Sequence, residues 1–341
     1  MIYRSKAPLR IGLAGGGTDV SPYSDQFGGA ILNATLSLHA HATIETTDHP
    51  QIEIRSIDKQ EQEVFDWSDT LPINGRLDLL KGVYNRIQKD HPFLKQGLRI
   101  STYVDAPAGS GLGTSSTLVV AIIGAFSEML KLPLGDYDMA HYAYEIERTD
   151  LALAGGRQDQ YAATFGGFNF MEFFGDDKVI VNPLRIRQDS INELENNLVL
   201  YFTSTTRESA AIIKEQQKNV TENNIKSIDA MHQLKEQAKM MKEALLTGKL
   251  DQIGEILDFG FQQKKNMAAK ISNPLMEEIY AAAKKAGASG GKISGAGGGG
   301  FMIFYCPGNS RYQVIETLAN FGGKVNPFQF TQHGLTSWTV A

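Results

Sequence analysis

The sequence predicts an α+β protein built from two unlike halves. Residues 1 to about 185 carry strand-like runs with helical patterns between them, whereas residues from about 206 to 286 are mainly helical before strands return. The polar and charged stretch RIRQDSINELENN (185–197) separates the two halves. Because such segregation is typical of α+β folds and 341 residues suit about two domains, we expect one domain over residues 1–187 and another over 188–341.

Five strand-like runs are expected in the first half. In each, β-branched and aromatic residues partly alternate with polar ones, which is typical of half-buried strands. The runs are YRSKAPLRIGLAG (3–15), HAHATIETTD (39–48), QIEIRSI (51–57), LRISTYVDA (98–106) and FGGFNFMEFF (165–174). Between them, patterns of helical period predict helices at about 77–90, 115–131 and 136–149.

Helices dominate the second half up to about residue 286. The longest pattern is IKSIDAMHQLKEQAKMMKEALLTG (225–248). Another, NPLMEEIYAAAKKAG (273–287), begins at an Asn-Pro pair suited to a helix cap and first turn and stops at Gly287. Short apolar runs then predict strands at 289–294, 300–306, about 323–329 and 335–340.

Composition and charge argue against several classes of function. The net charge of −5 and the sequence pI near 5.8 give no global field to attract nucleic acid or an acidic membrane surface. The opening residues MIYRSKAPLR have no apolar signal core, and no apolar run is long enough to span a bilayer. The single cysteine, Cys306, excludes an internal disulfide and a cysteine-based zinc site. We therefore expect a cytoplasmic protein without nucleic-acid or membrane partners.

The stretch DAPAGSGLGTSSTLVVAIIGAF (105–126) predicts an anion site. It follows a predicted strand and leads from a glycine loop into an almost wholly apolar helix. Free N–H groups and the positive end of the helix dipole would point into such a loop. The hydroxyls of Thr114, Ser115 and Ser116 either cap this helix or ligate a metal. No lysine follows the loop, so it is not the common P-loop.

Two further stretches place charged residues beside glycines. In APLRIGLAGGGTDVSPYSDQFGGAIL (7–32), Arg10 lies in an apolar strand and needs an acidic or phosphate partner. Asp19 either reaches a ligand hydroxyl or forms an ordinary Asx turn. In EIERTDLALAGGRQDQYAATFGGF (145–168), Asp159 follows a glycine pair and lies twelve positions beyond Glu147. Taken alone, an aspartate among glycines is usually a turn residue, and a glutamate on a helix usually lies on a solvated face.

A dense glycine cluster occurs in KISGAGGGGF (292–301), and it fits neither of the common nucleotide motifs. It contains a G-x-G-x-x-G pattern, but the apolar run FMIFYC follows where a dinucleotide site needs a helix. The Walker A pattern fails because only three residues separate Gly287 from the Gly-Lys pair and Ile293 replaces the required Ser or Thr. Because glycines add freedom that folding must remove, we expect this cluster where side chains would obstruct a ligand or another backbone.

Together these stretches resemble the GHMP kinase family, which includes galactokinase, homoserine kinase, mevalonate kinase and phosphomevalonate kinase. APLRIGLAGGGTD resembles the first motif of the family, PAGSGLGTSS its nucleotide loop and KISGAGGGG its glycine-rich third motif, in the right order along the chain. The resemblance implies an N-terminal domain of the ribosomal protein S5 domain 2 type with a left-handed β-α-β element, and a ferredoxin-like C-terminal domain. It also implies ATP and Mg²⁺ at a site between the domains, with the third motif beside the nucleotide loop.

The resemblance assigns roles residue by residue. Asp159 matches the catalytic aspartate that accepts the proton of the attacking hydroxyl, and Arg10 matches the basic residue that keeps it ionised. Ser115 and Glu147 match the magnesium ligands, although Thr114, where many members have Ser, leaves the choice of hydroxyl open. The residues implied in ATP binding are Pro107, Gly109, Gly111, Gly113, Thr114, Ser115, Ser116, Gly297 and Gly298.

The acceptor implied by the resemblance is a sugar phosphate. GGGTDVSPY, GGRQDQYAA, YFTSTTRESA (201–210) and ISNPLMEEIY are similar to the branch that phosphorylates the anomeric 1-hydroxyl of D-glycero-D-manno-heptose 7-phosphate, for GDP-heptose and surface polysaccharide. Thr18, Asp19 and Gly156 would then contact the sugar. Arg157 and Arg207, with Lys6 beside the first motif, are the candidates for its phosphate.

Two alternatives to this acceptor stay open. One is a kinase of an unphosphorylated sugar, of the fucokinase or galactokinase type. The other is a GHMP-fold binding protein that has lost catalysis, against which the four residues Arg10, Ser115, Glu147 and Asp159 argue. We expect a monomer or a homodimer.

Overall fold

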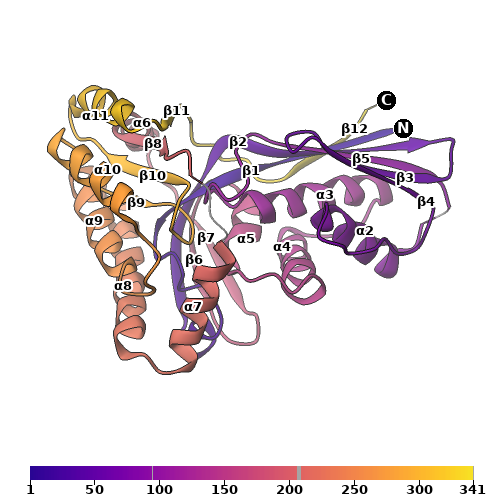
Figure 1. Cartoon of the computed structure of the whole chain (residues 1–341), viewed down its shortest axis with the longest axis horizontal. Coiled ribbons are helices and arrows are strands. Elements are labelled where there is room, and N and C mark those ends of the chain that lie inside the picture. Colours follow the sequence, from indigo (N-terminus) through magenta and orange to yellow (C-terminus); the bar gives the residue numbers. More distant parts are fainter. Residues whose placement is uncertain (94, 206–208, 341) are drawn as a thin grey trace.

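The computed structural model describes residues 1–93, 95–205 and 209–340, and two sheets organise them (Figure 1). The first sheet has eight strands with the path β12-β1-β2-β5-β3-β4, and β6 and β7 extend from β2. These strands are β1 (Ile2–Ala14), β2 (Gly29–Thr47), β3 (Gln51–Ser56), β4 (Glu61–Asp66), β5 (Gly97–Val104), β6 (Phe168–Phe173), β7 (Val179–Pro183) and β12 (Thr336–Val340).

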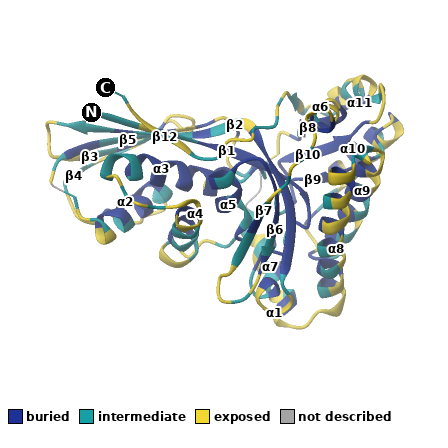
Figure 2. Cartoon of the chain, turned by 180° about the vertical axis from the view of Figure 1, so that it is seen from behind, coloured by how far each residue is buried: buried dark blue, intermediate teal, exposed yellow. Residues whose placement is uncertain are grey.

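Most helices of the first half form a layer on one face of this sheet (Figure 1). They are α2 (Asp78–Asp90), α3 (Thr114–Leu130), α4 (Asp136–Glu145), the π-helical turn η1 (Ile146–Asp150) and α5 (Gln158–Phe165). The short helix α1 (Tyr23–Phe27) lies apart from them, because Tyr23 packs with Ile212 and Met231 of the second half. Helix α3 is apolar on nearly all sides because it lies under β1 and β2 with other helices around it (Figure 2).

The second sheet is antiparallel, with the order β11-β8-β10-β9. Its strands are β8 (Leu198–Phe202), β9 (Gly290–Ile293), β10 (Phe301–Tyr305) and β11 (Lys324–Asn326). Numbered by their order in the chain, these strands lie in the spatial order fourth, first, third, second. This is the ferredoxin-like arrangement that the family resemblance implied. The α+β prediction is therefore confirmed.

The second half contains six α-helices and two short 3₁₀ turns among the described residues. These are α6 (Gln188–Asn197), α7 (Ser209–Thr221), α8 (Ile225–Thr247), η2 (Leu250–Gln252), α9 (Ile253–Lys264), α10 (Pro274–Lys285), α11 (Ser310–Leu318) and η3 (Ala319–Phe321). Asn273 caps α10 as expected, because its side chain accepts a hydrogen bond from the Met276 N–H at 3.0 Å. None of the helices in the described ranges is both long and apolar enough to cross a membrane.

Several elements differ from the sequence prediction. Strand β2 begins at residue 29 rather than 39. The elements that were not predicted are β4, β7, β8, α1, α5, α6 and α11. The chain also returns to the first sheet at its end, where β12 pairs with β1 from Ile2↔Val340 to Lys6↔Thr336. The division at residues 187 and 188 stays a prediction, but by its pairing the last strand belongs with the N-terminal sheet.

Candidate active site

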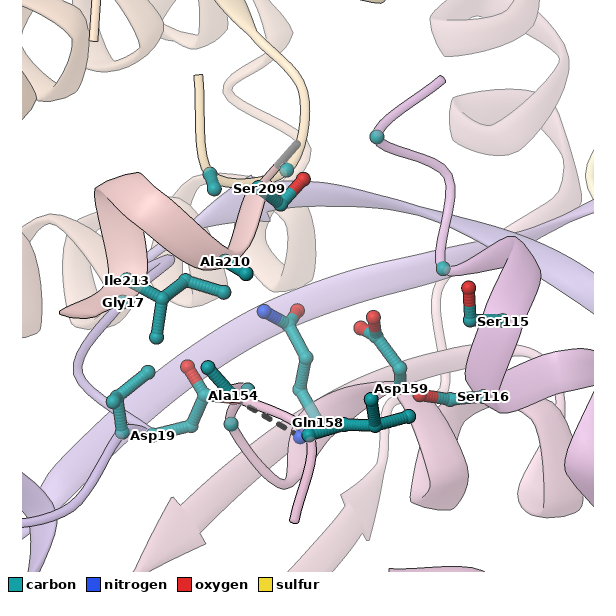
Figure 3. Close-up of a pocket in the computed structure, with 18 of the residues that line it drawn as sticks. Gly17, Asp19, Ser115, Ser116, Ala154, Gln158, Asp159, Ser209, Ala210 and Ile213 are labelled. Atoms are coloured by element: carbon teal, nitrogen blue, oxygen red, sulfur yellow. Dashed lines mark hydrogen bonds between the residues drawn. The ribbon is translucent and has the colours of Figure 1, made fainter. Parts of the chain in front are cut away.

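A cavity of about 720 Å³ opens where the three glycine-rich stretches meet (Figure 3). Its walls come from β1, the glycine loop before α3, the segment from η1 to α5, helices α7 and α9, and the loop after β9. The ionisable residues that line it are Arg10, Asp19, Glu147, Arg148, Asp159 and Lys264. The cavity thus collects charged groups from both halves of the chain.

Asp159 and Arg10 form the central ion pair of this cavity. Asp159 lies in the first turn of α5, and its carboxylate points into the cavity between Gln158 and Ser115 (Figure 3). The Arg10 Nε donates to Asp159 Oδ1 at 2.6 Å, and Arg10 Nη1 donates to the Gly111 carbonyl oxygen at 2.7 Å. The guanidinium is buried, whereas 23% of the Asp159 side chain stays exposed to the cavity. The buried Arg10 therefore holds the Asp159 carboxylate in place, while part of that carboxylate stays accessible to a ligand in the cavity.

The glycine loop has the form of an anion site. Gly109, Gly111 and Gly113 all have positive φ, at 72°, 84° and 78°, so the backbone turns in a way that favours glycine. Helix α3 follows with no side-chain cap, which leaves its first N–H groups to the cavity. Capping therefore does not account for the hydroxyls at 114–116, which line the cavity instead. Pro107 does not line it, but its carbonyl accepts from the Ser110 N–H at 3.2 Å and so closes the turn.

The third motif packs directly on this loop. A Cβ added at Gly295 would lie 2.7 Å from Gly111 Cα, and one added at Gly111 would lie 2.5 Å from the Ser294 carbonyl oxygen. The Ser294 hydroxyl donates to the Gly111 carbonyl at 2.8 Å. Gly297 and Gly298, predicted to bind ATP, do not line the cavity; the Gly298 N–H donates to the Ile271 carbonyl at 2.7 Å. They anchor the loop, while Gly295 and Ala296 face the cavity.

Glu147 supplies a buried carboxylate near the start of α3. It lies in η1, is 1% exposed, and accepts a hydrogen bond from the Gln160 amide. Burial raises the pKa of Glu147, and the positive charge of Arg148 opposes that effect. A bound cation would stabilise its ionised form. Glu147 and the Ser115 hydroxyl line the same cavity, so they fit the carboxylate and hydroxyl that a hard cation prefers.

Asp19 connects the first motif to the start of α5. Its Oδ2 accepts from the backbone N–H groups of Arg157 at 2.9 Å and Gln158 at 3.1 Å, and the second bond is drawn in Figure 3. Gly156 makes this contact possible, because a Cβ there would overlap the Asp19 carboxylate. Burial raises the pKa of Asp19 in spite of these hydrogen bonds. The residue is thus more than a local Asx turn and presents its carboxyl group at the cavity wall.

Comparison with known proteins agrees with this geometry. Residues 78–167 match the GHMP kinases N terminal domain, and residues 241–324 match the GHMP kinases C terminal domain. The chain is also 48% identical over 339 residues to D-glycero-alpha-D-manno-heptose 7-phosphate kinase of Campylobacter jejuni, covering 99% of both chains. This chain belongs to the GHMP kinase family. The predicted two-domain fold and the kinase class are confirmed, and with them ATP as a substrate.

Two further GHMP kinases bear on the acceptor. A solved structure of a D-glycero-D-manno-heptose 1-phosphate kinase from Bacteroides thetaiotaomicron has a TM-score of 0.84 and 47% identity, covering 99% of each chain. The bifunctional fucokinase/GDP-fucose pyrophosphorylase of Arabidopsis thaliana is 27% identical over 93% of this chain and 31% of its own length. All three relatives named here are kinases of sugars or sugar phosphates.

Several residues predicted to contact the acceptor do not reach the cavity of this GHMP kinase. The Thr18 hydroxyl donates to the carbonyls of Gly15 and Ala30 at 2.8 and 3.0 Å. It therefore stabilises the loop after β1 and does not face the ligand site. Lys6 is also absent from the cavity wall. Arg207 lies outside the described residues.

The structure does not bring the guanidinium of Arg157, predicted as a phosphate ligand, to the cavity wall. Its guanidinium is buried away from the cavity, where it donates to the Phe174 carbonyl at 2.8 Å and pairs with the Asp25 carboxylate. Only its backbone N–H faces the site, through Asp19. Arg157 therefore holds the segment before α5 in place.

Sequence reasoning missed several residues of the cavity wall, among them the polar side chains of Arg148, Gln158 and Lys264. Arg148 and Gln158 flank motif residues that were noticed. Lys264 gave no signal, because in FQQKKN it looks the same as the adjacent Lys265.

Proposed function

We propose that this GHMP kinase transfers the γ-phosphoryl group of ATP to the anomeric 1-hydroxyl of D-glycero-D-manno-heptose 7-phosphate, which gives the 1,7-bisphosphate. The observation that carries the reaction type is the Asp159–Arg10 pair, which faces the cavity between the nucleotide loop and Asp19. The 48% identity to the Campylobacter jejuni kinase over 99% of both chains supports the acceptor. The product would serve GDP-heptose and surface polysaccharide synthesis.

The chemistry proposed for Asp159 is general base catalysis. Its carboxylate accepts the proton of the sugar hydroxyl as that oxygen bonds to the γ-phosphorus and the bond to the β-phosphate oxygen breaks, which releases ADP. Arg10 orients the carboxylate and brings positive charge beside the nucleotide loop through its contact with Gly111. Phosphoryl transfer depends mainly on positioning and charge stabilisation, and this pair contributes to both.

Magnesium would be held by Ser115 and Glu147. When bound, it would neutralise charge on the phosphates of the nucleotide. Gln160 orients Glu147 by donating one amide N–H to it and also contacts Ser116 Oγ at 3.2 Å, so the carboxylate stays beside the start of α3.

The sugar would lie between Asp19 and Asp159, above the Gly155–Gly156 segment. Asp19 would accept hydrogen bonds from its ring hydroxyls. Because Arg148 lines the cavity and contacts the Gly156 carbonyl at 3.2 Å, beside the proposed sugar position, we propose it in place of Arg157 as the arginine that meets the phosphate of the acceptor. Arg207 stays a candidate for the same role.

The test is ADP release with ATP and Mg²⁺ against a panel of acceptors. The panel holds D-glycero-D-manno-heptose 7-phosphate, the matching heptose 1-phosphate, sedoheptulose 7-phosphate, mannose 6-phosphate, fucose, galactose and mevalonate. Phosphorus NMR of the product then shows which oxygen received the phosphoryl group. Turnover of the 7-phosphate with a new anomeric phosphate supports the proposal, whereas preference for the 1-phosphate would reverse the assignment of acceptor and product positions.

A kinase of a free sugar is the second candidate. The similarity to the fucokinase over 93% of this chain favours it, as does the direction of the Arg157 guanidinium, which removes one predicted phosphate ligand. Under this alternative, fucose or galactose has the highest kcat/KM of the panel.

A further inference from the structure

Lys264 is a buried lysine in the wall of the active-site cavity. It is the last residue of α9 and is 3% exposed. Its Nζ donates to the carbonyl oxygen of Gly295 in the third motif. A Cβ added at Gly16, in the first motif, would lie 3.7 Å from the same Nζ. One ammonium group therefore lies against both the first-motif loop and the third-motif loop.

The adjacent lysine shows what an ordinary environment would be. Lys265 pairs with the Glu277 carboxylate at 3.2 Å and lies over the Phe261 ring. Within the described ranges, Lys264 forms no such ion pair, and its hydrogen-bond partner is a neutral carbonyl. Burying an ammonium group without a paired anion is unfavourable, so this position suits an anion that arrives with a ligand.

The electrostatic surroundings agree with that view. Burial, together with the nearby positive charge of Arg10, lowers the pKa of Lys264 to about 8, and Asp19 opposes the shift. Lys292 is a useful contrast, because it is also buried and donates to the Gly12 carbonyl at 2.6 Å, but it does not line the cavity. Of these two buried lysines, only Lys264 is placed to meet a substrate.

The two loops that Lys264 contacts indicate where its ammonium group lies relative to the phosphoryl donor and acceptor. Gly16 lies in the same loop as Asp19, on the acceptor side, whereas Gly295 packs on Gly111 of the nucleotide loop, on the donor side. The phosphoryl group must pass between these sides. An ammonium group where the two loops meet can reach the oxygens of the transferred phosphoryl group. The phosphate that the acceptor already carries would lie farther away, at the other end of a seven-carbon chain.

We propose that the Lys264 ammonium contacts the phosphoryl group during its transfer and, with Arg10, stabilises the charge of the transition state. In this step the acceptor oxygen bonds to the γ-phosphorus, the bond to the β-phosphate oxygen breaks and the hydroxyl proton moves to Asp159. Lys264 stays protonated throughout. The inference rests on the proposed function only in requiring that a phosphoryl group crosses this cavity.

The experiment compares Lys264→Gln, Lys264→Arg and the control Lys265→Gln in steady-state ADP release. The glutamine keeps a donor near the Gly295 carbonyl but removes the charge, and the arginine restores the charge in a different shape. We expect Lys264→Gln to lower kcat by about 100-fold or more, with each KM changed less than about threefold, as for loss of one preorganised contact to a developing charge. Lys264→Arg should recover part of kcat, and Lys265→Gln should match the wild type.

Three results would overturn the inference. An unchanged kcat in Lys264→Gln would show that Lys264 does not contact the transferred phosphoryl group. A KM raised only for the phosphorylated acceptor would show that Lys264 binds the phosphate of the acceptor instead. Equal losses in the Gln and Arg variants, with a lowered melting temperature in the presence of Mg²⁺ and a non-hydrolysable ATP analogue, would indicate a structural role. The assays use whichever acceptor the wild type turns over fastest, so a wrong heptose assignment leaves this test intact.

Discussion

Arg10 and Asp159, 149 positions apart in the chain, meet with an Nε–Oδ1 distance of 2.6 Å. Because Arg10 also donates to the Gly111 carbonyl at 2.7 Å, one guanidinium sets the carboxylate in a fixed position relative to the nucleotide loop. Gly113 belongs to the same arrangement, since a Cβ there would lie 3.2 Å from the carboxyl carbon of Asp159. The proposed base, its orienting cation and the loop are thus joined in one set of direct contacts.

Replacing Asp159 by Asn should abolish turnover without abolishing nucleotide binding. The amide keeps the size of the side chain but cannot accept the proton of the sugar hydroxyl. We expect kcat to fall by about 10²–10⁴-fold, the usual contribution of a general base, with the Kd for ATP nearly unchanged. Calorimetric titration with ATP and an ADP-release assay measure both quantities. A wild-type kcat in this variant would show that Asp159 is not the general base.

Arg10→Lys should separate charge from orientation at the same pair. Lysine retains the positive charge but lacks the planar fork that reaches Asp159 and Gly111 together. We expect kcat to fall at least about tenfold, which corresponds to about 1.4 kcal/mol of transition-state stabilisation. If Arg10→Lys were as active as the wild type, a positive charge at this position would be enough for catalysis. The simultaneous contacts of Arg10 with Asp159 and Gly111 would then not contribute to the rate.

Gly111→Ala should disturb the contact between the nucleotide loop and the third motif. Alanine would adopt a φ near 84° with difficulty and would place its Cβ 2.5 Å from the Ser294 carbonyl oxygen. The matched control is Gly75→Ala, where φ is 91° but nothing lies within 4 Å of the added atom. Both variants carry the backbone strain, so a KM for ATP raised only in Gly111→Ala, by about tenfold or 1.4 kcal/mol, would report the lost loop contact.

The motif residues that face the cavity could be predicted because their chemistry is carried by local patterns. Arg10, Asp19, Ser115, Glu147 and Asp159 each lie in a glycine-rich or helix-start motif, and all five line one cavity. The ferredoxin-like sheet followed from the resemblance, not from the strand patterns. Strand β8 was missed because its five residues, LVLYF, follow directly on a polar helix and carry no turn signal of their own.

The direction of a side chain is what the motifs could not supply. Arg157 and Asp159 are two positions apart at the start of α5, and residues so spaced on a helix point to nearly opposite sides. Proximity in sequence to the catalytic aspartate therefore misled the phosphate assignment. Lys264 and Lys265 show the same limit, because about 100° of helix rotation separates a cavity residue from a surface ion pair.

Arg157→Ala should now act on stability more than on acceptor binding. The change removes a buried guanidinium, which takes the side-chain donor from the Phe174 carbonyl and the charged partner from the Asp25 carboxylate. We expect the free energy of unfolding to fall by about 1–3 kcal/mol, measured by urea denaturation. KM for a phosphorylated sugar should not rise more than KM for ATP. A selective rise in the acceptor KM would instead restore Arg157 as a phosphate ligand.

The buried ammonium of Lys264 should make the free energy of unfolding depend on pH. Comparison with Lys264→Gln isolates this contribution. The pKa of this group is lowered from 10.5 to about 8 in the folded protein, mainly by burial, with Arg10 and Asp19 as the charged neighbours. Below pH 8 both folded and unfolded chains hold the proton, and the full penalty of at most about 3 kcal/mol applies.

Between pH 8 and 10.5 the unfolded chain holds a proton that the folded protein has released, so the contribution of this group to stability rises with pH. Lys264→Gln lacks the penalty at every pH. We therefore expect the ligand-free variant to melt above the wild type at pH 7, and the gap between them to narrow as the pH approaches 10. Lys265→Gln controls for the loss of a charge near the protein surface. A gap that stays constant across this range would show that Lys264 is not a charged group held without an anion in the free enzyme.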